Sequence, residues 1–87
     1  MTAKTNALWR IALQRVIKME MSKRDVTYQA LSERLDAIGI QQSADNLRNK
    51  INKGILGADL LLQIMSVLNV RSLDFESVTE ILDDIQQ

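Results

Sequence analysis

Residues 27–54 read TYQALSERLDAIGIQQSADNLRNKINKG and predict two short helices separated at a glycine. Thr27 is a suitable N-cap for the first helix, because its hydroxyl can accept a hydrogen bond from an unpaired N–H group of the first turn. Gly39 can adopt the positive φ that ends many helices. The apolar residues between these two points recur at helical spacing, which predicts one buried face. That face is expected to comprise Ala30, Leu31, Leu35 and Ile38.

The second helix is expected to begin at the N-cap Ser43 and to end at Gly54. Its apolar seam is thin and comprises Ala44, Leu47 and Ile51. Asparagine contributes little to helix formation, so several on one helix indicate a use outside the helix. Amide and guanidinium groups on an exposed helix are the groups that read base edges in the major groove of DNA. The candidates for base contacts are Gln42, Ser43, Asn46, Arg48 and Asn49.

Basic residues flank these candidates and suit contacts with DNA phosphates. They are Lys23, Arg24, Lys50 and Lys53. Asp45 would repel phosphate unless it pairs with Arg48 at i+3 or Asn49 at i+4. Tyr28 is either a phosphate contact or a partly buried residue. The alternative interpretation of the whole segment is an ordinary solvated helix in a bundle, and Asp45 favours that alternative.

The net charge of zero conceals an asymmetry between the two parts of the chain. Residues 1–53 contain ten Lys or Arg residues and five Asp or Glu residues, for a net charge of +5. Residues 54–87 contain one basic residue, Arg71, and six acidic residues, for a net charge of −5. A basic part attracts a polyanion and an acidic part repels it. Chance variation in a small domain is the alternative explanation.

The remaining chain predicts three more helices, at about residues 4–21, 58–68 and 75–86, and no strands. The segment at 58–68 is apolar almost all round, so we expect it to be the central buried helix. The fold class is therefore all-α, with five helices in one domain over residues 1–87.

Composition argues against several classes of function. The chain has no cysteine and no histidine, which removes disulfides, thiolate metal sites and the commonest general base. No phosphate-binding glycine loop or nucleophile motif is present, so we expect neither an enzyme nor a cofactor or metal site. No apolar run is long enough to span a membrane, and no signal peptide is visible. A cytoplasmic protein without a membrane partner is the default expectation.

The sequence ALSERL at 30–35, NKINKG at 49–54 and LLLQIMSVLNV at 60–70 resembles the lambda-repressor-like (Cro/C1-type) helix-turn-helix fold. The phrases VTYQALSERLDAIG at 26–39 and NLRNKINKG at 46–54 more closely resemble an uncharacterised bacterial helix-turn-helix family of unknown function. The resemblance implies a helix-turn-helix at about 27–54 whose second helix enters the major groove. The chain departs from the compact repressor pattern in one respect, because the connection between these two helices is expanded.

The helix at 4–21 has a wide apolar stripe, and the helix at 75–86 has an apolar seam beside an acidic face. Together they offer more apolar surface than one small core requires, which predicts a homodimer. Its expected interface comprises Trp9, Leu13, Ile17, Val78, Ile81, Leu82 and Ile85. For the single tryptophan, packing in the core is an equally good explanation.

These patterns favour a small dimeric bacterial or phage repressor that binds double-stranded DNA in a sequence-specific manner with helix 43–53. The main alternative is a protein-interaction module. A mixed alternative is an antitoxin-like regulator whose acidic C-terminal helix binds a protein partner. Membrane-surface binding through the basic face of the first helix is a weaker third alternative.

Overall fold

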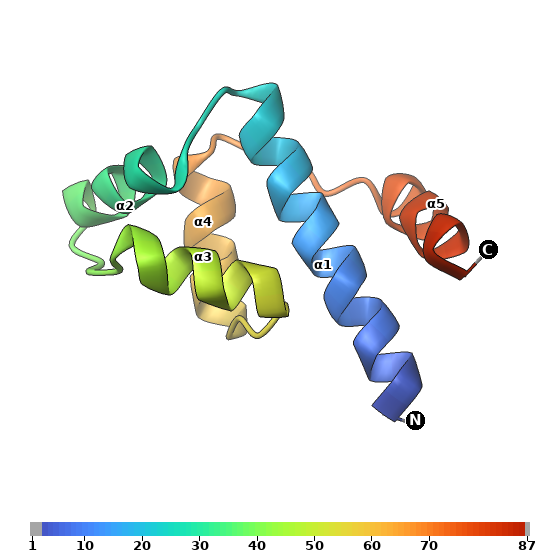
Figure 1. Ribbon diagram of the computed structural model, residues 1–87. Helices are drawn as coiled ribbons and strands as arrows, with labels where there is room; N and C mark the ends of the chain where they lie inside the picture. Colours follow the sequence, from blue (N-terminus) through green and yellow to red (C-terminus); the bar gives the residue numbers. More distant parts are fainter. Residues whose placement is uncertain (1–2, 87) are drawn as a thin grey trace.

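A computed structural model describes residues 3–86, with side chains described from Asn6 onward. The described residues form five α-helices and no strand (Figure 1). The helices are α1 (Ala3–Lys23), α2 (Tyr28–Ala37), α3 (Ala44–Lys53), α4 (Ala58–Val67) and α5 (Phe75–Gln86). The prediction of an all-α fold with five helices is therefore confirmed. None of the described helices combines the length and the apolar character needed to cross a bilayer.

Thr27 and Ser43 cap α2 and α3 as their hydroxyl groups predict. The Oγ1 atom of Thr27 accepts a hydrogen bond from the N–H of Ala30 at 3.1 Å. The Oγ atom of Ser43 accepts one from the N–H of Asn46 at 3.0 Å. Each bond satisfies a backbone donor that has no partner inside the first turn. Local side-chain chemistry thus determines where both helices begin.

Residues with positive φ follow four of the helices. Gly39, with a φ of 84°, follows α2, and Gly54, with a φ of 64°, follows α3. Asp25 and Asn69 take the same left-handed conformation after α1 and α4, with φ values of 54° and 61°. Asp and Asn tolerate this conformation better than most other residues. The helix α1 ends at Lys23, slightly beyond its expected end.

The long helix α1 crosses the molecule and separates two groups of helices (Figure 1). On one side, α2 packs against both α3 and α4, and α3 packs against α1. On the other side, α5 packs against α1. The pair that carries the sequence segment 27–54 is therefore separated from the acidic C-terminal helix by the width of α1.

The core is built by α1 to α4. Its fully buried side chains are Ile17, Leu31, Leu35, Leu47, Ile51, Ile64 and Leu68. Two expectations about burial were wrong. Ile38 is 54% exposed, because α2 ends before it and its side chain leaves the helix face. Leu62 is 70% exposed, because α5 packs against α1 and leaves this face of α4 uncovered.

Candidate nucleic-acid interface

The helix α3 has one buried face and one broad polar face. Leu47 and Ile51 are fully buried and fasten the helix to the core. Asn49 lies two positions from each of them, and such positions are about 200° apart around an α-helix. Asn49 therefore points away from the core. The exposed residues of α3 are Asp45, Asn46, Arg48, Asn49, Asn52 and Lys53.

The C-terminal end of α3 lies very close to α1. A Cβ atom built on Gly54 would be 2.5 Å from the backbone carbonyl oxygen of Arg10, so only glycine allows this approach. The side-chain amide of Gln14 lies nearby and has one orientation that satisfies both of its hydrogen-bonding neighbours. In that orientation its N–H donates a hydrogen bond to the carbonyl oxygen of Asn52 at 3.2 Å, and its oxygen accepts one from the ammonium group of Lys18 at 3.1 Å. These contacts hold α3 at a definite position on α1.

The N-terminal end of α3 is fixed by the connection from α2, which comprises residues 38–43. The hydroxyl group of Ser32 donates a hydrogen bond to the backbone carbonyl oxygen of Gln42 at 2.6 Å. The side-chain oxygen of Gln42 accepts a hydrogen bond from the ammonium group of Lys50 at 3.3 Å. The expanded connection is therefore tied to both helices, and α3 is held at each end.

The five candidates for base contacts fall into two groups. Asn46, Arg48 and Asn49 are exposed together on the polar face of α3. Gln42 and Ser43 precede the helix, and their side chains already make hydrogen bonds within the chain. Of the five candidates, Asn46 and Asn49 are the ones whose side chains make no hydrogen bond within residues 6–86 and are free to meet a ligand.

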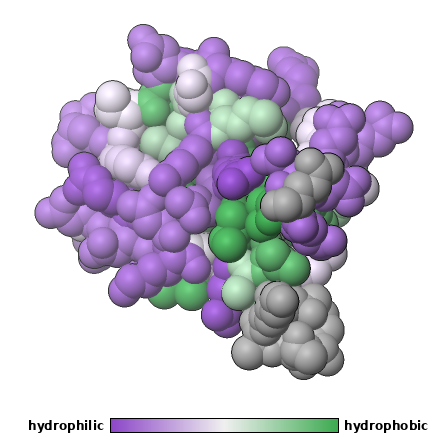
Figure 2. All heavy atoms as spheres, turned by 45° about the vertical axis from the view of Figure 1, so that its right-hand side comes forward, coloured by the Kyte–Doolittle hydropathy of each residue, from purple (hydrophilic) through white to green (hydrophobic). Residues whose placement is uncertain are grey.

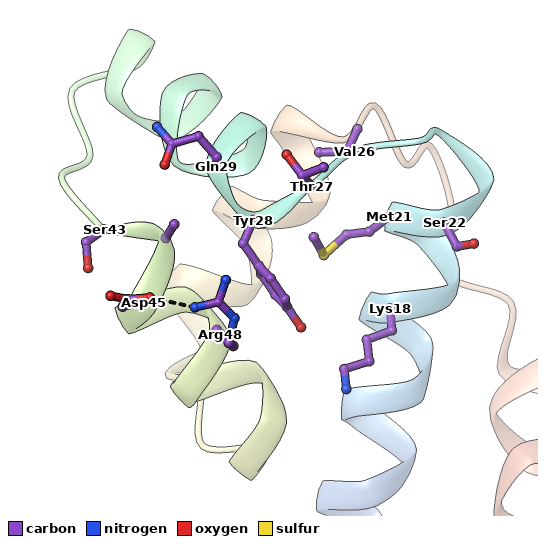
Figure 3. Close-up of a pocket in the computed structure, with 11 residues that line it drawn as sticks. Lys18, Met21, Ser22, Val26, Thr27, Tyr28, Gln29, Ser43, Asp45 and Arg48 are labelled. Carbon is purple, nitrogen blue, oxygen red and sulfur yellow. Dashed lines mark hydrogen bonds and ion pairs between the residues drawn. The ribbon is translucent and has the colours of Figure 1, made fainter.

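Arg48 is held between an aromatic ring and a carboxylate. Its guanidinium group lies over the ring of Tyr28, 5.2 Å from the ring centroid. It also forms an ion pair with Asp45, as the i,i+3 spacing predicts (Figure 3). The pairing masks the negative charge that would otherwise oppose a phosphate. Stacking and pairing together restrict the orientation of the arginine.

A shallow hollow with a volume of about 770 Å³ lies where the beginnings of α2 and α3 face the end of α1. Figure 3 shows the ring of Tyr28 and the side chain of Lys18 reaching into this space from different helices. Gln29 adds an exposed amide at the beginning of α2. Neither Lys18 nor Gln29 is among the contact residues that the sequence predicts. Lys18 is ten residues from Tyr28, and only the packing of α1 against α3 brings it to this site.

The candidates for phosphate contacts differ in how far their charge is already neutralised. Lys23 and Arg24 both approach the carboxylate of the buried Glu20, at 3.2 Å and 3.4 Å. Lys50 is half-buried and bonded to the side chain of Gln42. Lys53 is exposed and forms no ion pair within the described side chains. The least compensated cation of the four therefore lies on α3 itself.

Residues 9–73 match the protein family described as a domain of unknown function, DUF6471. The match covers about three quarters of the chain and includes α2, α3 and α4. The chain belongs to the DUF6471 family. No curated protein and no solved structure matches it. The expected membership of an uncharacterised family is confirmed, while the lambda-repressor-like assignment stays a prediction.

The acidic helix α5 lies beyond the part of the chain that matches DUF6471, on the opposite side of α1 from α3 (Figure 1). Its exposed acidic residues are Glu76, Glu80, Asp83 and Asp84. Asp84 forms an ion pair with Arg15 of α1 at 3.0 Å, and both side chains are largely exposed. The described side chains include no group of three or more acidic residues arranged to hold a metal ion. In the DUF6471 protein the exposed carboxylates of α5 therefore lie across α1 from the polar face of α3.

The expected dimer interface is wrong at two positions. Ile17 is fully buried in the core, and Val78 is buried where α5 packs against α1. Helical spacing alone placed them on an open stripe, but neighbouring helices of the same chain cover them. Leu13 packs against the core and is partly buried, and Trp9 is 49% exposed. The other three candidates, all on α5, are half-buried, namely Ile81, Leu82 and Ile85.

Proposed function

We propose that the chain binds double-stranded DNA and regulates transcription, with α3 as the helix that enters the major groove. The observation that carries this proposal is the polar face of α3. Three residues with base-reading chemistry are exposed there beside a free lysine, namely Asn46, Arg48, Asn49 and Lys53. The major groove has room for an α-helix, so a helix anchored on one side by Leu47 and Ile51 can insert its other side.

The chemistry of this face matches the pattern of hydrogen-bonding groups on base edges. Asparagine pairs with adenine through two hydrogen bonds, and arginine does the same with guanine. Each such pair contributes about 1–3 kcal/mol of discrimination against a wrong base. Arg48 is already oriented by Tyr28 and Asp45, so it loses less conformational freedom on binding than a free arginine.

The arrangement of α2 and α3 supports a helix-turn-helix interpretation. The two helices pack against each other, and their N-terminal ends border the same hollow. The order of the helices also resembles the lambda-repressor-like fold, in which the second helix of the pair reads the DNA. We therefore propose that α3, the second helix of the pair, reads the DNA here as well, and that the protein acts as a small repressor.

The cations around α3 suit contacts with the sugar-phosphate backbone. We propose that the predicted phosphate contacts are joined by Lys18 and by the hydroxyl of Tyr28, which border the hollow. Backbone N–H groups at the beginnings of α2 and α3 add a positive dipole end to the same region. The acidic helix α5 lies across α1 from this surface, which favours one orientation of the protein on a polyanion.

The proposal is tested by binding a pool of random DNA duplexes at about 50 and about 200 mM salt and sequencing the retained molecules. We expect a short motif to be enriched and affinity to fall steeply with salt. Retention without a motif would exclude base reading by α3. No retention at either salt concentration would exclude the DNA-binding proposal as a whole.

Two single substitutions separate base reading from phosphate binding. Asn49→Ala should relax the preference at one position of the motif, because Asn49 is at the centre of the exposed face. Lys53→Ala should weaken binding to all duplexes and reduce the salt slope by about 1. The assignment of roles is wrong if the two variants lower affinity by the same factor on every duplex.

A protein-interaction module is the second candidate function, and an apolar groove beside Trp9 favours it. In this case an antitoxin-like protein would bind a partner through the side of the molecule that carries the acidic α5. Such a partner would copurify with the chain from its native host at low salt. Absence of duplex binding together with a stoichiometric protein partner would favour this candidate over DNA binding.

A further inference from the structure

An apolar groove of about 350 Å³ lies between α1, α4 and the segment that leads into α5. Trp9 and Leu13 of α1 line it, together with Leu61 and Met65 of α4. The groove exists because α5 packs against α1 rather than against α4, which leaves the space between α4 and α5 open. No residue of α3 lines it.

Most of the exposed large apolar side chains of the described chain gather at this groove. They are Trp9 at 49%, Leu62 at 70%, Leu73 at 44% and Phe75 at 66% exposure. The two aromatic side chains alone leave on the order of 200 Å² of surface uncovered. The four together expose roughly half of the ~800 Å² that each partner contributes to a standard protein interface. An exposed apolar area of this extent is comparable with the largest apolar patch of a typical monomer, which is often functional.

Figure 2 shows apolar residues gathered on one face of the molecule, with hydrophilic residues around them. The most exposed apolar residue at the groove is Leu62, on α4. The next is Phe75, at the beginning of α5. One surface therefore carries a hollow and also carries projecting side chains of the kind that fill such a hollow.

We propose that a second copy of this chain covers the groove in a twofold symmetric dimer. In such a dimer the same surface patch faces itself, so it must complement its own shape. A groove with Phe75 at its edge meets this condition, because each copy can insert its ring into the groove of the other. A large aromatic ring in an apolar hollow is also the usual anchor of a protein interface.

The charges at the edge of the groove also fit a second copy. Arg71 lines the groove, and Glu76 follows Phe75 at its edge. Neither forms an ion pair within residues 6–86. A twofold axis can bring Arg71 of one copy to Glu76 of the other. The dimer would then contain two equivalent ion pairs. A partner of one charge sign would leave either the arginine or the glutamate unpaired.

This dimer is independent of DNA binding, because the polar face of α3 stays exposed in both copies. It also differs from the interface expected from the sequence. Trp9, Leu13 and Val78 all line the groove, although Val78 is buried. Ile17 instead serves the interior of one chain. Leu62, Leu73 and Phe75 are added to the residues expected from the sequence.

The test is the molar mass in solution, measured by sedimentation equilibrium from about 1 µM to about 1 mM. We expect the mass to rise from the 9.9 kDa of one chain towards twice that value. Phe75→Asp and Leu62→Asp should each weaken association by about tenfold or more, because a charge would enter an apolar interface. Ile38→Asp is the matched control, since Ile38 is 54% exposed and does not line the groove.

Circular dichroism of each variant establishes that its helices are intact. If Phe75→Asp weakens α5, Leu62→Asp still tests the groove, because Leu62 lies on α4. A mass of one chain at every concentration would overturn the proposal. So would a dimer that both groove variants leave intact. Laurate, a fatty-acid anion, is added as a probe of the alternative occupant. If the chain is monomeric and laurate shifts the fluorescence emission of Trp9, the groove binds an anion with an apolar chain, and the second copy is excluded. Loss of association in both groove variants, while Ile38→Asp still forms a dimer, would support the proposed dimer.

Discussion

Replacing Gly54 by alanine should destabilise the domain much more than the same change at Gly39. Both glycines have positive φ, at 64° and 84°. An alanine in this left-handed conformation costs about 1–2 kcal/mol. The reduced freedom of the unfolded chain offsets about 0.4–1 kcal/mol of that cost. The conformational part of the change is therefore about 1 kcal/mol at either position.

The approach of α1 distinguishes the two positions. A Cβ atom at Gly54 would lie 2.5 Å from the carbonyl oxygen of Arg10 and 2.8 Å from its Cβ atom. A Cβ atom at Gly39 would have no heavy atom of another residue within 4 Å, apart from its chain neighbours. The backbone of α1 cannot turn aside as a flexible side chain can, so α1 and α3 must separate. Such overpacking costs about 1–3 kcal/mol, for a total of about 2–4 kcal/mol at Gly54.

The assay is urea unfolding followed by circular dichroism and by the emission of Trp9, the single tryptophan of the chain. We expect a large loss of unfolding free energy for Gly54→Ala and a loss of about 1 kcal/mol for Gly39→Ala. Folded Gly54→Ala should also bind duplex DNA more weakly, because α3 is displaced on α1. Equal losses of stability in the two variants would refute the argument that a close helix approach requires Gly54.

Two further substitutions test the supports of the candidate interface. Ser43→Ala should lower the unfolding free energy by about 1 kcal/mol because α3 loses its cap, whereas Ser43→Asp retains an acceptor and should stay near the wild type in thermal unfolding. Equal melting temperatures for Ser43→Ala and the wild type would contradict this role. Glu20→Gln removes the carboxylate that Lys23 and Arg24 approach, so duplex affinity at low salt should rise and the salt slope should steepen by up to about 2. An unchanged slope would remove both cations from the proposed phosphate contacts.

The two proposed surfaces have different physical characters. The polar face of α3 offers amides and cations, and its energy would come from hydrogen bonds and counterion release. The groove beside Trp9 offers apolar surface, and its energy would come from the exclusion of water. Salt therefore separates them experimentally, because it weakens the first kind of binding strongly and the second only slightly.

The polar face of α3 was predictable because its residues are close together in the sequence. Asn46 and Asn49 share a face through helical spacing alone, and the ion pair of Arg48 with Asp45 follows from the same geometry. The stacking of Arg48 on Tyr28 was not predictable. Twenty residues separate the two, and the contact exists because α2 packs against α3.

The sequence by itself determined the five helices and the residues at which α2 and α3 begin. Thr27 and Ser43 cap helices, and Gly39 and Gly54 follow them, because these effects depend on a few neighbouring backbone groups. Only the tertiary structure decided which apolar residues are covered. Ile17 and Leu62 are both apolar residues within helices, yet one is fully buried and the other is 70% exposed. Burial depends on which helix packs alongside a given face. That packing is set by the apolar faces of all the helices together, because one small core cannot cover every one of them.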